Sequence, residues 1–275
     1  MSVKKCLTIA GSDCSGGAGI QADLKTFAAH GCYGASVITS IVSENTEGVL
    51  STYNVPVNEV ANQLDAVFED IQIDAVKLGV LPTVDIIKIV AEKLMKYLPK
   101  YIVCDPVLMA SSGDALTSEE TIDAYIEHIF PLVTLITPNI PEAGAFTGMS
   151  ISTINDMKGA AAAMYSLGAS AVMVKGGHLE EGHATDVLYD GKDASSIRVV
   201  KVDSPNTHGT GCTLSSAIAA NLANGFALGG AVFSAKDYVT EAISKSYPVG
   251  KGHGPVNHFF EYWKDMRKHY EKAEK

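Results

Sequence analysis

The chain has 275 residues, of which 47% are hydrophobic, and it carries a net charge of −10. This length allows one large domain or two small ones, and no stretch reaches the roughly 18 uncharged apolar residues of a transmembrane helix. The acidic balance and the lack of basic runs argue against nucleic acid and anionic membranes as partners. Five cysteines without paired CxxC spacing favour a reducing, cytoplasmic setting.

Short apolar runs alternate with amphipathic segments along most of the chain. Strands are predicted at 6–10, 35–42, 74–79, 101–107, 132–138 and 170–177, and helices at 20–31, 58–71, 83–97, 117–129, 154–167, 210–224 and 227–246. Residues 183–204 predict an antiparallel pair at a sheet edge, with its turn at 190–193. The pattern predicts a single three-layer α/β/α domain over residues 1–265, with a mostly parallel sheet, followed by a solvated tail at 266–275.

The segments that follow the predicted strands hold most of the chemically interesting residues. In open α/β sheets, ligands bind beyond the carboxyl ends of the strands. That rule selects 12–19, 43–45, 79–81, 105–107, 137–142, 175–178 and 206–212. Their clustering at strand ends predicts an enzyme whose site is assembled from several loops.

The segment SPNTHGTGCTLSSAIAANLANG, residues 204–225, places a cysteine behind a glycine turn and at the head of a helix. Gly209 and Gly211 allow a tight turn whose N–H groups, with the helix N-terminus, can hold an anion. Cys212 in the first helical turn is expected to have a lowered thiol pKa. A helix start with a small buried cysteine is the structural alternative. No lysine follows the second glycine, so the segment is not a P-loop.

The segment LTIAGSDCSGGAGIQADL, residues 7–24, predicts a strand, a glycine-rich loop and a helix. Residues 17–22 match G-x-G-x-x-A and Glu44 could bind a ribose, so a dinucleotide-dependent oxidoreductase is a second hypothesis. Against it, the glycines come about six residues after the predicted strand, whereas the dinucleotide fingerprint turns at once. The other interpretation is a loop that lets backbone approach a small substrate.

Three oxygen-bearing side chains stand at two neighbouring strand ends: Asp105 in VCDPV, and Asn139 and Glu142 in TPNIPEAG. Carboxylate and amide oxygens suit Mg²⁺, although Asn139 and Glu142 also have the spacing of a helix cap. Lys175 precedes two glycines, where it can reach a phosphate as a point charge or simply be solvated. The histidines lack metal-binding spacing, so no zinc site is predicted.

Together these segments resemble the hydroxymethylpyrimidine/phosphomethylpyrimidine kinases of thiamine biosynthesis, within the ribokinase superfamily. The resemblance covers about residues 5–260 and is carried by LTIAGSDCSGGAGIQADLKTF, YGASVITSIVSENTEGV, DPVLMASSGDAL, LITPNIPEA, VKGGH, NTHGTGCTLSSAIAANLA and GKGHGPVNHF. Pyridoxine and pyridoxal kinases of the same superfamily are the near alternative. A vitamin-binding protein that keeps the fold without catalysis is a third hypothesis.

The resemblance implies a ribokinase-like fold and ATP-dependent phosphorylation of a hydroxymethyl group and then of the resulting monophosphate, by a homodimer. It makes Cys212 the proton acceptor and Gly209, Thr210 and Gly211 the anion hole, assigns Lys175 and Thr207 to ATP, and places Asp105, Asn139 and Glu142 around Mg²⁺. The pyrimidine contacts that it implies are Ala18, Asp23, Glu44, Val80 and Val107. A requirement for a monovalent cation is left open.

Two of these positions depart from the family's pattern, because ENT replaces the usual QNT and GVL the usual GML. A glutamine can accept from the ring's amino group and donate to a ring nitrogen. Glu44 only accepts, unless it or the ring nitrogen is protonated. Val80 is shorter than methionine and leaves more room. Both changes make a pyridoxine-type ring more plausible and leave the exact substrate open.

Overall fold

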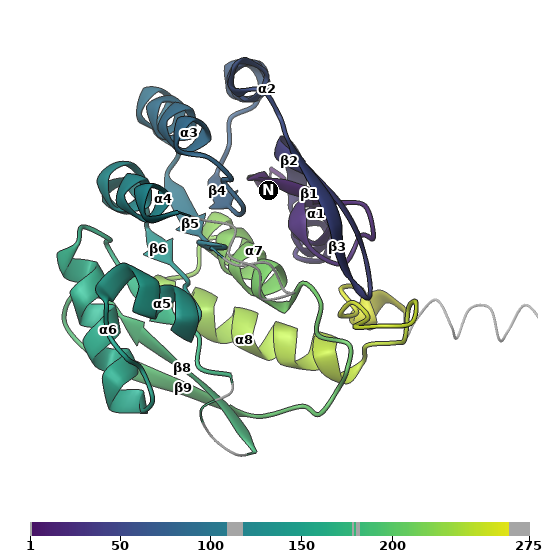
Figure 1. Cartoon of the computed structure of the whole chain (residues 1–275). Coiled ribbons are helices and arrows are strands. Elements are labelled where there is room, and N and C mark those ends of the chain that lie inside the picture. The colour runs from purple at the N-terminus through teal and green to yellow at the C-terminus, as the bar shows by residue number, and fades with distance from the viewer. Residues whose placement is uncertain (1, 109–117, 178, 180–181, 264–275) are drawn as a thin grey trace, which may run out of the picture.

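The computed structural model describes residues 2–108, 118–177, 179 and 182–263. Within this part of the chain, one nine-stranded sheet has the order β3-β2-β1-β4-β5-β6-β7-β8-β9 (Figure 1). Its strands are β1 (Lys5–Asp13), β2 (Tyr33–Asn45), β3 (Gly48–Asn54), β4 (Ala75–Leu78), β5 (Tyr101–Cys104), β6 (Leu135–Ile136), β7 (Val172–Val174), β8 (His183–Tyr189) and β9 (Ala194–Val200). The six strands from β2 to β7 in this order pair in parallel, and β3, β8 and β9 add antiparallel edges.

Helices cover both faces of the sheet (Figure 1). On one face lie α1 (Gly19–Ala29), α7 (Thr210–Ala223) and α8 (Leu228–Ser244); on the other lie α2 (Val57–Asp70), α3 (Val84–Tyr97), α4 (Glu119–Ala124), α5 (Ile140–Thr147) and α6 (Ile154–Ser166). A π-helical turn η1 (Tyr125–Ile129) and a 3-10 turn η2 (Phe130–Leu132) continue α4. Each face has its own cluster of buried apolar side chains, so the central strands are buried on both sides.

The predicted three-layer architecture with a mostly parallel sheet is confirmed. The hairpin expected near the end of the chain is the edge pair β8–β9, with its turn at 190–193. Strand β3 was not predicted, because its side chains are mostly exposed and no apolar run marks it. The helix expected at 58–71 begins one residue earlier, at Val57 after Pro56, without a side-chain cap bond. The predicted tail at 266–275 lies outside the described residues.

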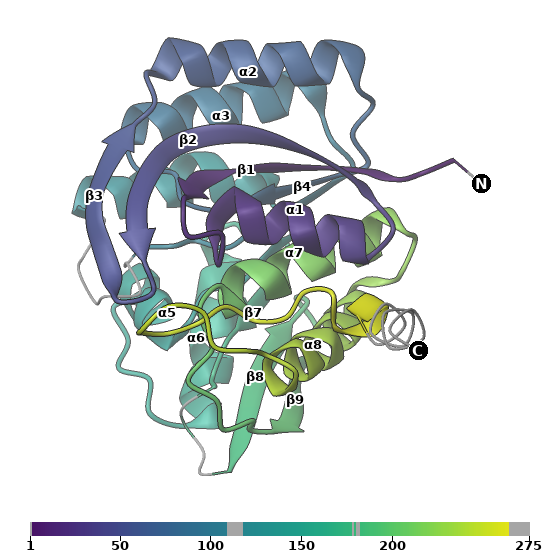
Figure 2. The same ribbon diagram turned by 90° about the vertical axis from the view of Figure 1, so that its right-hand side faces the viewer.

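The segment 250–258, here called the C-terminal strap, runs from the β2–β3 turn back beside α7 and α8 (Figure 2). The N–H of His253 donates to the carbonyl of Thr46 in the β2–β3 turn at 2.8 Å. The N–H of His208 donates to the carbonyl of Gly254 at 3.1 Å. The strap therefore joins the β2–β3 hairpin to the loop that precedes α7.

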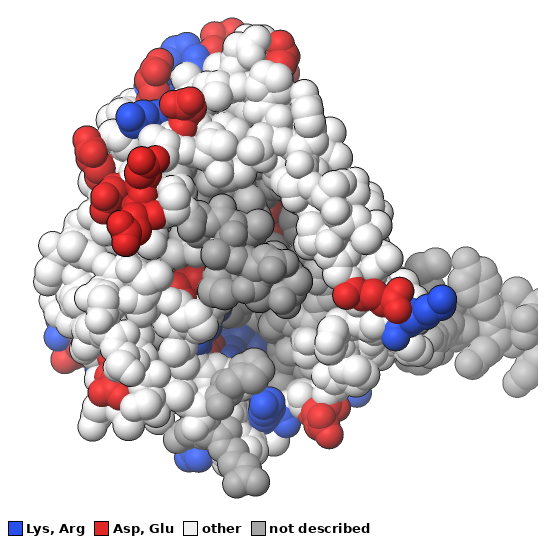
Figure 3. Space-filling model, viewed as in Figure 1, with Lys and Arg blue, Asp and Glu red and all other residues white. Residues whose placement is uncertain are grey.

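The described helices and the surface in Figure 3 add two observations. No helix in the described part of the chain has the length and apolarity that crossing a membrane requires. Among the described residues on the face in Figure 3, acidic side chains gather at the upper left, over α3 and α4, and the basic side chains are scattered.

Candidate active site

Two cavities adjoin at the carboxyl edge of the parallel strands. The outer cavity, about 420 Å³, is lined by the loop 207–212 and by Asp105, Asn139, Glu142 and Lys175. The inner cavity, about 390 Å³, lies against the ends of β1, β2 and β4. Ala18, Glu44, Val107, His208 and Cys212 line both. A molecule in one cavity can therefore meet a molecule in the other at these residues.

The turn before α7 directs the start of that helix at the outer cavity. Gly209 has a φ of 77°, and a Cβ there would overlap the carbonyl oxygen of Gly17, so only glycine allows the two glycine loops to pack together. The Thr210 hydroxyl donates to the carbonyl of Thr207 at 2.7 Å and tightens the turn. The predicted anion-holding segment, with Gly211, thus lines the outer cavity at a helix N-terminus.

Cys212 lies at the junction of the two cavities. The expected lowering of its pKa is wrong: burial raises the pKa of the thiol to about 11, although Lys77 and the N–H of Gly19 oppose the shift. Desolvation of the thiolate outweighs the helix N-terminus here. The nearby positive charge of Lys77 therefore matters to the chemistry that Cys212 can perform.

The predicted oxygen ligands and Lys175 meet at one end of the outer cavity. Lys175 Nζ lies 2.6 Å from Asp105 Oδ1. Asn139 and Glu142 also form the capping box of α5: Asn139 Oδ1 accepts from the N–H of Glu142 at 2.9 Å, and Glu142 Oε2 accepts from the N–H of Asn139 at 2.7 Å. Burial raises the pKa of Glu142 to about 7, with Lys175 opposing the shift and Asp105 adding to it.

Asp23 requires a correction, because it lies behind the wall of the inner cavity. Its side chain is fully buried, and its carboxylate accepts from Lys77 Nζ at 2.9 Å, from the hydroxyl of Thr8 at 2.5 Å and from that of Ser216 at 2.7 Å. The geometry therefore does not support a direct contact between Asp23 and the ring. Lys77, which no sequence motif marked, lines the cavity instead.

The other four predicted ring contacts are brought together. Val80 lines the inner cavity, and Ala18, Glu44 and Val107 line both cavities. The carbonyl of Val80 accepts from the hydroxyl of Thr39 at 2.6 Å, which fixes the backbone after β4. The inner cavity therefore combines apolar residues such as Val80 and Val107 with polar ones, among them Glu44, Lys77 and His208.

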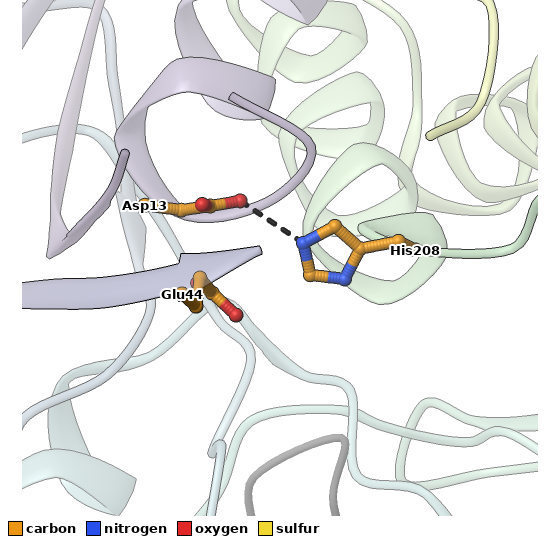
Figure 4. A group of neighbouring side chains, drawn as sticks. All are labelled: Asp13, Glu44 and His208. Atoms are coloured by element: carbon orange, nitrogen blue, oxygen red, sulfur yellow. Dashed lines mark hydrogen bonds and ion pairs between the residues drawn. The ribbon is translucent and has the colours of Figure 1, made fainter. Parts of the chain in front are cut away.

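Glu44 faces a second titratable pair, Asp13 and His208 (Figure 4). His208 Nε2 lies 3.0 Å from Asp13 Oδ2, and this bond raises the pKa of His208. Although burial opposes it, the same bond and N–H donors of the glycine loop hold the pKa of the Asp13 carboxyl well below its usual range.

Burial raises the pKa of Glu44 to about 7, and Asp13 adds to the shift while His208 opposes it. Ligand atoms of the three side chains lie within 4.8 Å of one another. Because hydrogen bonds already engage both oxygens of Asp13, we interpret the group as a proton-sharing cluster and not as a metal site. Asp13 and His208 were not singled out from the sequence, although both lie within the motifs quoted above.

An α/β/α fold in which a glycine-bracketed helix start adjoins two cavities at a sheet edge defines the class of ribokinase-like small-molecule kinases. Among solved structures, the chain is similar to a pyridoxal kinase of Bacillus subtilis in an ADP complex: 41% identity, a TM-score of 0.88, 94% of this chain and 98% of that chain. It is also similar to a phosphomethylpyrimidine kinase of Clostridium difficile: 45% identity, a TM-score of 0.78, 87% of this chain and 99% of that chain.

The chain belongs to the phosphomethylpyrimidine kinase family, whose model matches residues 13–257. A hydroxymethylpyrimidine/phosphomethylpyrimidine kinase of Rhizobium meliloti is 47% identical over 94% of this chain and 98% of its own length. A thiamine biosynthesis bifunctional protein of Geobacter sulfurreducens is 48% identical over 92% of this chain. The matched region covers 51% of that longer protein. The chain is thus a phosphotransferase, and the oxidoreductase and non-catalytic hypotheses are wrong.

Proposed function

We propose that this chain transfers the terminal phosphate of ATP first to 4-amino-5-hydroxymethyl-2-methylpyrimidine and then to its monophosphate, in thiamine biosynthesis. The observation that carries the proposal is the meeting of the two cavities at Cys212. An acceptor ring in the inner cavity and a nucleotide in the outer cavity would present their reacting atoms to each other at this residue. Curated relatives with this activity, 47% and 45% identical to the chain, support the same assignment.

The outer cavity suits the triphosphate. The N–H groups of residues 209–212 at the start of α7, with Thr207 beside them, offer a site for phosphate oxygens. Lys175 adds a positive charge that is held in place by Asp105. Gly211 keeps the approach open, because a Cβ there would lie 3.3 Å from Asp105 Oδ2 and 3.4 Å from Lys175 Nζ.

The residues at the Asp105 end of the outer cavity fit Mg²⁺. Asp105 and Glu142 present carboxylates whose mutual repulsion contributes to the raised pKa of Glu142, which a divalent cation would relieve. Asn139 Oδ1 accepts one backbone hydrogen bond and has a second lone pair. When bound, Mg²⁺ would neutralise charge on the triphosphate.

Cys212 receives the proton in the proposed reaction. The substrate's hydroxymethyl oxygen forms a bond to the terminal phosphorus, the bond from that phosphorus to ADP breaks, and the hydroxyl proton passes to Cys212 Sγ. The N–H groups of residues 209–211 stabilise the negative charge on the transferring group. A thiolate is a modest base for an alcohol, so positioning and charge stabilisation supply most of the rate.

The test is turnover of Cys212→Ala. This variant should bind ATP as the wild type does in a thermal-shift titration and lose about 100-fold or more in kcat. Cys32→Ala is a matched control, since Cys32 is a buried thiol next to β2 that lines neither cavity. Unchanged turnover in Cys212→Ala would remove the base assignment.

Pyridoxal or pyridoxine is the second candidate substrate. Glu44 and Val80 in the inner cavity depart from the sequence pattern of the hydroxymethylpyrimidine kinases. A pyridoxal kinase also shares the fold, with a TM-score of 0.88. Mass spectrometry of a reaction with hydroxymethylpyrimidine, its monophosphate, pyridoxine and pyridoxal would separate the two. A phosphorylated pyridine as the sole product would overturn the pyrimidine assignment.

We also propose that the chain acts as a homodimer in the cytoplasm. All five cysteines are free, in agreement with a reducing setting. The edge strand β3 exposes Leu50 and Tyr53, whose relative exposures are 76% and 64%. Edge strands with exposed apolar side chains are usually covered. Light scattering at micromolar concentration tests the dimer, and a monomer there would contradict it.

A further inference from the structure

Lys77 is a charged side chain in the middle of the sheet. All four residues of β4 are buried, and the Lys77 side chain has an exposure of 0%. Its Nζ lies 2.9 Å from both carboxylate oxygens of Asp23 on α1. Thr8 of β1 and Ser216 of α7 donate to the same carboxylate. Four elements therefore hold this ammonium group at one position.

Lys77 lies in the wall of the inner cavity. Lys77 lines that cavity together with Cys212. Gly79 provides the space, because a Cβ there would lie 2.9 Å from Lys77 Nζ. Ser216 follows Cys212 by four residues on α7, so the carboxylate network and the thiol lie along one face of this helix.

A purely structural role does not require a charge at this position. Taking a lysine and an aspartate out of water costs several kcal/mol per ion, and well-packed apolar residues of similar size often serve a fold as well. The neighbours of Lys77 along β4, Val76 and Leu78, are such apolar residues and are fully buried. The ion pair is therefore best explained by an action on the cavity.

We propose that Lys77 is a positioning residue that acts through Cys212: its fixed positive charge stabilises the thiolate form, which Cys212 must adopt before it can take the substrate's proton and become a neutral thiol. Asp23 holds the ammonium group and moderates its effect on the sulfur. The inference rests on the proposed role of Cys212 as proton acceptor. It concerns the acceptor side of the site and is separate from the nucleotide contacts of Lys175.

The charges around Cys212 come from several elements. Burial raises the pKa of its thiol, Lys77 lowers it, and Asp23 and Asp105 raise it. Lys175 is the second cation near the sulfur, and its own pKa is raised in part by Cys212. Since Lys77 lowers the thiol pKa and Asp23 raises it, removing each charge should shift that pKa in opposite directions.

The experiment measures the thiol directly in the full chain without nucleotide. The rate of alkylation of Cys212 by iodoacetamide is followed against pH by mass spectrometry of its peptide, with the exposed Cys14 in the same sample as internal control. Asp23→Asn leaves the lysine charge unopposed and should lower the Cys212 pKa by about one unit. Lys77→Met combined with Asp23→Asn should raise it at least about one unit above that of Asp23→Asn. Lys77→Arg keeps the charge, so the Cys212 pKa in this variant should lie near its wild-type value.

The double variant guards against misfolding, because it leaves no unpaired buried charge. The pH at which kcat rises should move with the thiol pKa in each variant, whereas a merely structural change would alter kcat without moving that pH. Alkylation profiles of Cys212 that are the same in Asp23→Asn and the double variant overturn the inference alone. Unchanged turnover in Cys212→Ala overturns the base role instead, so the two failures are told apart.

Discussion

Replacing Glu44 with glutamine tests how this chain holds an aminopyrimidine ring. Glu44 lines both cavities, and burial, with the charge of Asp13, raises its pKa to about 7. A carboxyl group can pair with both the amino group and a ring nitrogen only when one proton is shared between carboxyl and ring. A glutamine offers an acceptor and a donor at every pH.

The shared proton makes binding to the wild type depend on pH. Below pH 7 most free enzyme already carries the proton on Glu44, whereas above pH 7 binding must take a proton up. The protonated fraction falls from about one half at pH 7 to about 3% at pH 8.5, so the KM for the pyrimidine should rise roughly fifteenfold. Glu44→Gln should show a lower KM that stays flat over this range.

The assay is the initial rate of ADP release at saturating ATP between pH 6.5 and 8.5, about half a unit below and 1.5 units above the Glu44 pKa. Val80→Met is the matched control, because it fills the inner cavity without changing protonation. This variant should lower the KM for the pyrimidine, and that KM should still rise with pH as it does in the wild type. A wild-type KM that is flat with pH, or a Glu44→Gln KM that rises in parallel, would refute the reasoning.

Three further predictions concern the loop, the nucleotide and the strap. Gly209→Ala, at a φ of 77°, should lower the free energy of unfolding in urea by more than about 2 kcal/mol, whereas Gly211→Ala should lower it by less than about 1 kcal/mol. Equal losses of stability in the two variants would contradict the backbone argument. Lys175→Met should raise the KM for ATP about tenfold, and an unchanged value would remove it from the phosphate site. His258→Leu removes the partner 3.0 Å from the Thr213 hydroxyl and should cost about 1 kcal/mol, measured by chemical denaturation; wild-type stability would show that the strap does not support α7.

The order of elements was predictable because alternating apolar patterns show which residues must be buried. The helix expected at 83–97 is Val84–Tyr97, and the hairpin expected after residue 183 is β8–β9. Strand β3 could not be predicted in the same way, because its position depends on pairing with β2 and not on burial.

The family and the strand-end residues could also be read from the sequence, since ligand sites in α/β folds follow the strands. The environment of those residues could not. Asp23 was assigned to the ring, but it bonds Ser216, which is 193 residues away along the chain, and Lys77 takes its place at the cavity. No local pattern encodes such a contact.

By itself, the sequence determined the layered fold, the kinase family and the turn that points a helix start at the outer cavity, because periodicity, glycine placement and strand ends are local properties. Only the tertiary structure decided which titratable side chains lie close enough to shift one another's pKa values. The raised pKa of Cys212, the Glu44–Asp13–His208 cluster and the buried Lys77–Asp23 pair all depend on desolvation and on partners brought from distant segments.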